Sequence, residues 1–143
     1  MRKPIWILTV LINIPMLSCV KTPVFDEKQA FVYLEKQCAF GPRNPGSDGH
    51  QRCLDYLIDE LKINCDQVTQ QQFVYTDKKD STKKFHSTNI IASINLQPKK
   101  KQRVMLCAHW DTRPWADKDP DSTNRNKPIL GANDGASGVA VLL

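Results

Sequence analysis

The segment 104–143 constrains the fold more than any other part of the chain. Five apolar residues at 104–108 stand between polar neighbours and predict a buried strand. His109 and Asp111 follow directly, and residues two apart in an extended chain point to the same side. The sequence therefore predicts an imidazole and a carboxylate that emerge together at the carboxyl end of a strand.

A second polar group comes from a glycine-flanked turn. The sequence GANDG at 131–135 opens onto an apolar run that is typical of the start of a helix. Because ligands of open α/β sheets bind outside the carboxyl ends of the strands, we expect Asp134 to lie beside His109 and Asp111. Spacing alone leaves two hypotheses open. Histidine and aspartate are zinc ligands, but a hydrogen-bonded histidine–aspartate pair can also be purely structural.

The polar loop between these two parts carries several large side chains. Trp110, Arg113 and Trp115 stand beside the candidate ligands, and irregular polar chain continues to residue 124. Long irregular loops inside compact domains are often functional, so these three residues are candidates for a substrate pocket. The alternative is that one tryptophan packs on the sheet edge and Arg113 pairs with a nearby acid. We expect at least one of the three to be structural.

Earlier segments predict two helices and two strands before the apolar run. Asp26 caps a helix that runs to about residue 39, and Ser47 caps a second helix that ends near residue 64. This order of elements indicates an α/β sandwich with a mixed sheet. The three predicted strands span 67–75, 86–94 and 103–108.

Helical and strand spacing also predicts the core. His50, in the first turn of the second helix, is predicted to be an ordinary surface histidine. The predicted core side chains recur at intervals that place them on one face of each element. They are Phe31, Leu34, Cys38, Cys53, Leu54, Leu57, Ile58, Leu61, Ile90, Ile91 and Ile94.

Composition and charge narrow the function classes. With 143 residues, of which 41% are hydrophobic and 24% charged, the chain suits a single globular domain. The net charge is +5, and Arg2 and Lys3 carry two of these charges outside the predicted domain. The remaining charge is too small to indicate nucleic-acid binding, and the basic run at 99–103 is predicted to be a solvated turn.

The first 19 residues predict export. A basic start precedes an apolar run at 5–12, and the residues that end at Cys19 resemble a bacterial lipobox, in which the cysteine is lipidated. The alternative is an ordinary cleaved signal with an incidental cysteine. A membrane-spanning anchor is disfavoured, because the apolar run is shorter than the roughly 20 residues of a membrane helix. We expect a lipid anchor on Cys19 and a location facing the periplasm or cell surface. The predicted segments are a signal peptide at 1–19, a tether at 20–24 and a domain at 25–143.

Four further cysteines, Cys38, Cys53, Cys65 and Cys107, lie inside the predicted domain. In an oxidising compartment they allow three disulfide pairings. Cys38 and Cys53 fall on apolar helix faces and Cys107 in the predicted strand, so small buried apolar side chains are an equally good interpretation. Their wide spacing makes them poor zinc ligands.

Taken whole, the sequence resembles the zinc aminopeptidase and glutaminyl cyclase superfamily. The resemblance is carried by AHWDTRPWAD and GANDGASGVAVLL, preceded in the same order by GPRNPGS and TNIIASI, and it covers 25–143. The tryptophan-bearing loop and GPRNPGS look closest to bacterial glutaminyl cyclase-like lipoproteins. The resemblance implies a three-layer α/β sandwich with a mixed sheet, of which this chain holds the first half.

The same resemblance implies a role for each matching residue. Asp134 matches the aspartate that binds zinc in the cyclases and bridges two zincs in the peptidases. His109 matches the histidine that binds one metal in the two-zinc peptidases and lies near the single zinc of the cyclases without binding it. Asp111 matches a supporting catalytic acid, which orients the residues of the site without binding the metal itself. Gly135 and Gly138 match positions where the backbone passes close to the metal and the following helix packs tightly.

The family's general-base glutamate, a further acidic ligand and a C-terminal histidine ligand have no match here. We therefore interpret the chain as the N-terminal part of a longer protein or as a truncated reading frame. For the complete protein, the resemblance implies a zinc-dependent glutaminyl-peptide cyclotransferase with one zinc. It would convert N-terminal glutamine of peptides and proteins to pyroglutamate and release ammonia. The alternatives are an aminopeptidase with two zincs and a non-catalytic surface lipoprotein.

Overall fold

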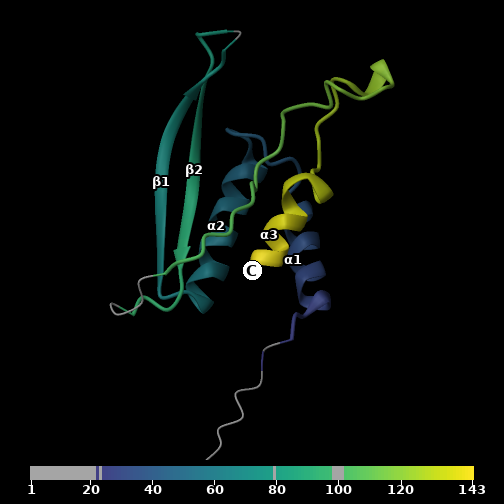
Figure 1. Cartoon of the computed structure of the whole chain (residues 1–143). Helices are drawn as coiled ribbons and strands as arrows, with labels where there is room; N and C mark the ends of the chain where they lie inside the picture. Colours follow the sequence, from purple (N-terminus) through teal and green to yellow (C-terminus); the bar gives the residue numbers. More distant parts are fainter. Residues whose placement is uncertain (1–21, 23, 79, 98–101) are drawn as a thin grey trace, which may run out of the picture.

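The computed structural model describes residues 22, 24–78, 80–97 and 102–143. The predicted export signal with Cys19, most of the tether and the lysines at 99–101 lie outside the described residues. Within the described ranges, no helix is both long enough and apolar enough to span a membrane. In chain order the elements are α1 (Glu27–Ala39), α2 (Asp48–Asn64), β1 (Gln67–Thr76), β2 (Lys84–Ser93), the 3₁₀-helix η1 (Ser122–Asn124), the kinked turn η2 (Ala132–Ala136), whose backbone is non-helical at Asp134 and Gly135, and α3 (Ser137–Leu142) (Figure 1).

Helices α1 and α2 begin at the predicted caps. The side chain of Asp26 accepts a hydrogen bond of 2.9 Å from the Gln29 N–H, and α1 follows. The side chain of Ser47 accepts one of 3.1 Å from the His50 N–H, and α2 follows. A cap of this kind contributes about 1 kcal/mol, because it satisfies a donor that the first helical turn leaves free.

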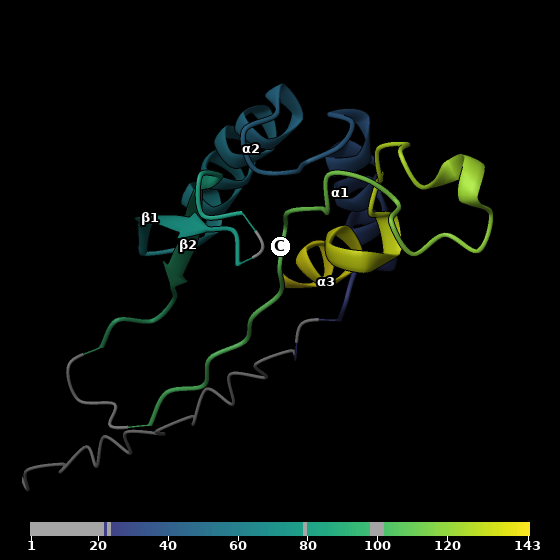
Figure 2. The same ribbon diagram turned by 90° about the horizontal axis from the view of Figure 1, so that it is seen from above.

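Strands β1 and β2 form an antiparallel hairpin beside α2 (Figures 1 and 2). Gln67 pairs with Ser93 at one end, and Tyr75 pairs with Phe85 near the other, where their ring centroids lie 6.2 Å apart. Both predicted strands are therefore confirmed, with small shifts at their ends. Most of their side chains are exposed, because only part of the hairpin is covered by another element.

Residues 103–108 form no strand, so the prediction of a third, buried strand is wrong for this structure. A β-strand is held by hydrogen bonds to a neighbouring strand, and the sheet formed by the described residues contains only β1 and β2. Val104, Met105, Leu106 and Cys107 are consequently exposed. The described part is α/β, as predicted, but its sheet is antiparallel and not mixed.

The core lies between α2 and α3. Burying a leucine-sized side chain contributes roughly 1.5–3 kcal/mol, and α2 supplies most of the buried apolar residues. At the centre are Cys53, Leu57 and Val139, with Phe40, Tyr56, Ile90, Trp110 and Leu143 packed against them.

Three predicted core residues, Phe31, Ile91 and Ile94, are exposed, and the prediction is wrong for them. The reason is that no described element covers their side chains. Ile91 and Ile94 line an apolar groove of about 790 Å³, which the exposed residues 104–108 also line. Part of the apolar side chains in these segments therefore stays exposed in the described fold.

The four described cysteines are free. Cys53 is buried in the core, as the apolar interpretation predicts, and this burial raises the pKa of its thiol to about 11. Cys107, in contrast, is exposed because its segment has no strand partner.

Candidate metal centre

The structure brings His109 and Asp134 together. Nε2 of His109 lies 2.9 Å from Oδ1 of Asp134. His109 directly follows the 102–108 segment, whereas Asp134 lies in η2. Their side chains are 56% and 81% exposed, so the pair stands at the surface of the described fold, open to an ion or to another part of a protein.

Glycines make this close approach possible. Gly135 has φ 111°, a conformation that L side chains rarely adopt. A Cβ added there would lie 3.1 Å from Cε1 of His109 and 3.2 Å from the carbonyl oxygen of Asp111. Gly138 similarly allows α3 to approach Ala108, because an added Cβ would lie 3.1 Å from the Ala108 Cβ. The turn that carries Asp134 therefore rests directly on the residues around His109.

Asp111 contacts the other side of the His109 ring. Nδ1 of His109 lies 3.1 Å from the carbonyl oxygen of Asp111 and 3.4 Å from its Oδ1. Burial on its own lowers the pKa of His109. The hydrogen bonds to Asp134 and to the Asp111 carbonyl, together with both carboxylate charges, outweigh burial and raise this pKa above its usual value. The imidazole is therefore held at both ring nitrogens.

Arg43, in the GPRNPGS loop, is a site residue that sequence reasoning missed. Its side chain is fully buried. The guanidinium donates hydrogen bonds of 2.9 Å to each of the carbonyls of Trp110, Leu130 and Gly131. Its backbone N–H donates to Oγ1 of Thr112 at 3.0 Å. The only sequence signal was the GPRNPGS motif itself, which marks a loop but not a buried cation.

Gln37 is a second buried polar residue that helical spacing did not predict. Its Nε2 donates hydrogen bonds of 3.1 Å to the carbonyls of Tyr33 and Ala136, and its own carbonyl accepts one of 3.2 Å from Nη1 of Arg43. Its Oε1 is buried without a partner among the described residues. Helix α1 is thus tied both to η2 and to Arg43.

The indole of Trp110 is turned into the core. Its Nε1–H donates to the Thr88 carbonyl at 3.2 Å, and the ring stacks on His50 with centroids 4.2 Å apart. His50 is only 6% exposed, so the prediction of a surface histidine is wrong. Its burial depends on Trp110, a partner far along the chain. This burial lowers the pKa of His50, and the charge of Asp111 opposes the shift.

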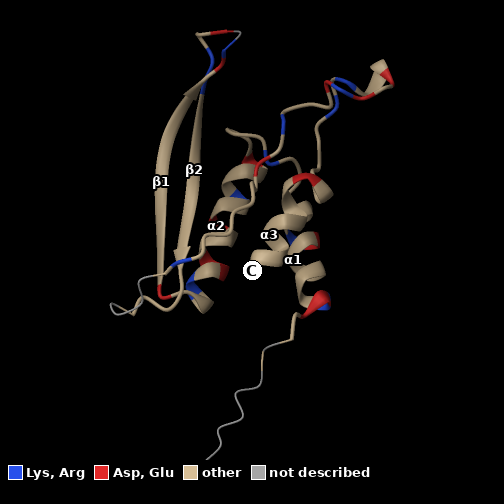
Figure 3. Cartoon of the chain, viewed as in Figure 1, with Lys and Arg blue, Asp and Glu red and all other residues tan. Residues whose placement is uncertain are grey.

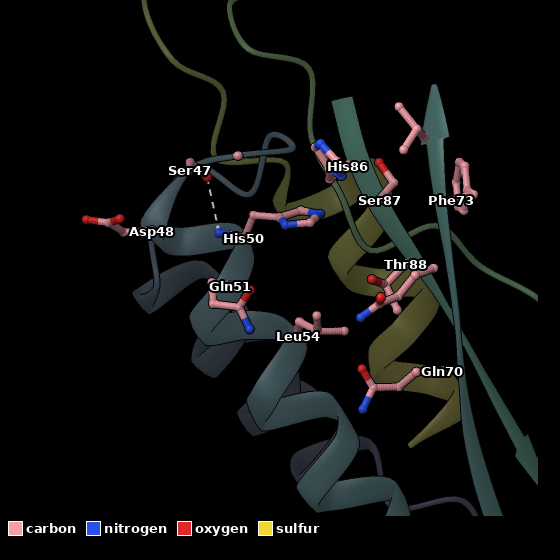
Figure 4. Close-up of a pocket in the computed structure, with 13 residues that line it drawn as sticks. Ser47, Asp48, His50, Gln51, Leu54, Gln70, Phe73, His86, Ser87 and Thr88 are labelled. Carbon is pink, nitrogen blue, oxygen red and sulfur yellow. Dashed lines mark hydrogen bonds between the residues drawn. The ribbon is translucent and has the colours of Figure 1, made fainter. Parts of the chain in front are cut away.

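His50 also lines a cleft of about 550 Å³ between the start of α2 and the β1–β2 hairpin. Figure 4 shows its ring reaching from the helix toward the strand that carries His86 and Thr88. His109 and Asp134 do not line this cleft. The two histidines of the cleft are therefore separate from the candidate centre.

The tryptophan-bearing loop projects away from the helices (Figures 1 and 2). Arg113 pairs with Asp117, as the structural alternative predicts. The Ala116 N–H donates to the Lys127 carbonyl at 2.9 Å, so the loop is held by its own contacts. Trp115 is exposed. Of the three candidate pocket residues, one indole is thus packed, the guanidinium is paired, and one indole is open.

The donor chemistry of the central pair fits zinc. Imidazole nitrogen and carboxylate oxygen are zinc ligands, and two donors on a tetrahedral zinc lie roughly 3.3 Å apart at bond lengths of about 2.0–2.1 Å. The 2.9 Å between His109 and Asp134 is close to this separation. A catalytic zinc has three protein ligands, and in the part of the chain that the structure describes no three His, Cys, Asp or Glu side chains gather as a metal site. The described residues therefore supply part of a coordination shell.

Comparison with known proteins defines the class of this fold. Residues 89–143 match the model of Peptidase family M28. The described structure has the α/β fold of glutaminyl cyclases and zinc exopeptidases. The resemblance that the four motifs predicted is therefore confirmed. No protein of curated function matches the chain.

The chain is similar in particular to bacterial glutaminyl cyclases. It is 47% identical to the solved cyclase of Tannerella forsythia (TM-score 0.76) and 44% identical to that of Bacteroides thetaiotaomicron, solved with N-acetylhistamine (TM-score 0.77). It is also 42% identical to a Zn-dependent exopeptidase of Parabacteroides distasonis (TM-score 0.77). Each match covers 84% of this chain and 40% of the solved chain. The chain thus spans about 40% of the length of these relatives, which fits its small sheet.

Proposed function

We propose that the whole protein is a zinc-dependent glutaminyl-peptide cyclotransferase. The observation that carries the proposal is the separation of 2.9 Å between an imidazole nitrogen of His109 and a carboxylate oxygen of Asp134. This pair occurs in a chain that is 47% identical to a solved glutaminyl cyclase. The reaction would close an N-terminal glutamine to pyroglutamate and release ammonia.

In this proposal, the residues of the pair have different tasks. Asp134 holds the zinc, and His109 lies against Asp134 and fixes its carboxylate. Asp111 orients His109, because its carbonyl and carboxylate both face Nδ1 of the ring. Zinc, when bound, would act as a Lewis acid on the γ-carbonyl of the substrate glutamine.

The tryptophan-bearing loop is proposed to contact the peptide. The exposed ring of Trp115 offers an apolar surface, and Arg113, which pairs with Asp117, adds a positive charge to the same loop. Excluding water matters here, because hydrolysis of the same bond competes with cyclisation. Trp110 contributes differently, by holding the segment after His109 against β2 through its bond to Thr88.

A second candidate is a two-zinc aminopeptidase. The 42% identity to a Zn-dependent exopeptidase favours it. Asp134 would then hold both ions and His109 one of them. Both candidates use the same two residues in different tasks, so the number of bound zinc ions and the reaction products separate the two functions.

We further propose that the domain begins near residue 25, and that the protein is exported and anchored by lipid on Cys19, facing the periplasm or cell surface. The basic start, the apolar run and the lipobox-like residues before Cys19 support this proposal. Its partners would be peptide or protein N-termini and not nucleic acid. Acidic and basic residues follow one another along the hairpin connection and the tryptophan-bearing loop (Figure 3), a mixture of charges that does not favour nucleic-acid binding there.

The test uses the whole protein, expressed from its complete reading frame. Bound zinc is counted by elemental analysis, and a glutamine-initiated peptide is assayed for products. One zinc with ammonia and a pyroglutamyl peptide supports the cyclase, whereas two zincs with free glutamine support the peptidase. Asp134→Asn should lose zinc and turnover, while Asp59→Asn, at an exposed site on α2, should keep both. A folded protein that binds no zinc and converts no peptide contradicts both candidates.

A further inference from the structure

We propose that Arg43 is a positioning residue that sets the separation of His109 and Asp134. The inference rests on the proposed function, because it gives Arg43 a task in building that metal centre. The side chain of Arg43 forms no hydrogen bond with His109 or Asp134; it donates to the backbone carbonyl of Trp110, next to His109, and to that of Gly131, at the start of the turn that carries Asp134. It therefore acts through the two segments that carry the pair.

The first segment is the one that carries His109. Nε of Arg43 donates to the carbonyl of Trp110 at 2.9 Å, one residue after His109. The Arg43 N–H donates to Oγ1 of Thr112 at 3.0 Å, and the Thr112 N–H donates back to the Arg43 carbonyl at 3.2 Å. Three hydrogen bonds thus fix the backbone on both sides of Asp111.

The second segment is the turn that carries Asp134. Nη1 and Nη2 of Arg43 donate to the carbonyls of Leu130 and Gly131, each at 2.9 Å. The Gly131 carbonyl also accepts a 3.2 Å bond from the Ala136 N–H, which closes η2. A Cβ added at Gly131 would meet Cγ2 of Thr112 first and would lie 3.3 Å from Nη2 of Arg43, so the turn packs against both of these residues.

The surroundings of Arg43 point to a geometric task. Its side chain is fully buried, and its partners among the described residues are carbonyl oxygens, with no carboxylate. A buried charge without a counter-ion is unfavourable unless many hydrogen bonds compensate it. The planar fork of arginine reaches carbonyls of two segments at once, whereas the single ammonium of lysine does not. One guanidinium therefore joins the two halves of the centre at a fixed spacing.

The test compares three variants of the whole protein. Arg43→Lys keeps the positive charge and loses the fork. Arg52→Lys is the matched control, because Arg52 also donates to a backbone carbonyl, that of Phe40 at 3.0 Å, but at an exposed site on α2. Thr112→Val removes only the hydroxyl that accepts from the Arg43 N–H and leaves the buried guanidinium in place. This milder variant keeps the test decisive should Arg43→Lys fail to fold.

Two measurements separate positioning from general stability. The zinc dissociation constant and the absorption spectrum of the cobalt-loaded protein report the metal shell. The hydrogen bonds by which Arg43 holds residues 109–112 and 131–136 are called the clamp. Amide hydrogen exchange of the metal-free protein in these two segments reports the clamp itself. We expect Arg43→Lys to weaken zinc binding at least about tenfold, the order expected for residues that orient ligands. It should also alter the cobalt spectrum and speed exchange in both segments. Thr112→Val should follow in the same direction, and Arg52→Lys should match the wild type.

The outcomes are distinct. A folded Arg43→Lys or Thr112→Val protein with a lower melting temperature but unchanged zinc affinity and cobalt spectrum overturns the proposal, because Arg43 would then only stabilise the fold. Unchanged exchange in both segments overturns the clamp on its own. A wild-type protein that binds no zinc refutes the proposed function and the metal task together, and faster exchange in Arg43→Lys would then still identify the clamp as structural.

Discussion

Replacing Gly135 by alanine would perturb the candidate centre from its backbone side. Gly135 has φ 111° and ψ −64°, which only glycine adopts readily. An added Cβ would lie 3.1 Å from both Cε1 and the carbonyl oxygen of His109 and 3.2 Å from the carbonyl oxygen of Asp111. The substitution therefore strains the turn and also pushes on His109.

The two costs can be separated with glycines elsewhere in the chain. A non-glycine residue in such a conformation costs about 1–3 kcal/mol, and crowding a packed site costs roughly another 1–3 kcal/mol. We expect Gly135→Ala to lower the free energy of unfolding by about 2–6 kcal/mol on these two principles. Gly46 has φ 88° and open space around an added Cβ, so Gly46→Ala should show the strain alone. Gly138 has only the 3.1 Å contact with Ala108, so Gly138→Ala should show crowding alone.

Urea denaturation of the whole protein measures the free energy of unfolding of each variant, and zinc titration measures the effect on the centre. Gly135→Ala should lose more stability than Gly46→Ala. It should also be the variant whose zinc affinity falls at least about tenfold, because the crowded residue, His109, fixes the carboxylate of Asp134 in the proposed centre. Equal stability losses for Gly135→Ala and Gly46→Ala, with unchanged zinc affinity in both, would refute the argument that the turn must rest on His109.

Three further outcomes are expected. Asp26→Ala should lower the free energy of unfolding by about 1 kcal/mol through loss of the α1 cap, and a urea midpoint equal to that of the wild type contradicts this. Burial raises the pKa of the Cys53 thiol from 9.0 to about 11, so its contribution to stability is complete below pH 9 and is lost as pH rises toward 11. Cys53→Ala should remove the fall in the free energy of unfolding between pH 9 and pH 11. If this free energy falls equally in the variant and in the wild type, ionisation of Cys53 does not cause the fall. Residues 1–143 produced alone should bind zinc weakly and show no turnover. The reason is that the described residues bring two possible donors together, whereas a catalytic zinc has three protein ligands. Tight binding of one zinc per chain, measured by calorimetry, would contradict this prediction.

Features set by neighbouring residues were predictable from the sequence. Asp26 and Ser47 cap the helices because a cap contacts the next turn of its own chain. The approach of Asp134 to His109 was also predictable, although the two lie in separate segments. An apolar run that ends in HxD and a glycine-flanked turn before a helix are both local patterns, and the usual position of ligand sites in α/β folds predicts that they meet. They do meet, although residues 103–108 form no strand.

Features set by distant partners were not predictable. Residues 103–108 have the composition of a strand, but a strand forms only with a neighbour, and the described residues provide none. Arg43 and His50 look like solvated residues in a loop and a first helical turn. They are buried because the chain after residue 109 covers them, Trp110 by stacking on His50 and Thr112 by bonding to Arg43. Nothing local to either residue signals that partner.

The hydrogen bonds of Arg43 also have a consequence for the order of folding. They join positions 67, 69, 87 and 88 residues apart, whereas α1 and α2 are built from contacts within a few residues. Closing long loops carries an entropy cost, and distant contacts form slowly. We therefore expect the two donors to come together late, after the helices exist. An ion that meets the nascent chain would then find isolated ligands first and could leave again before the pair closes around it.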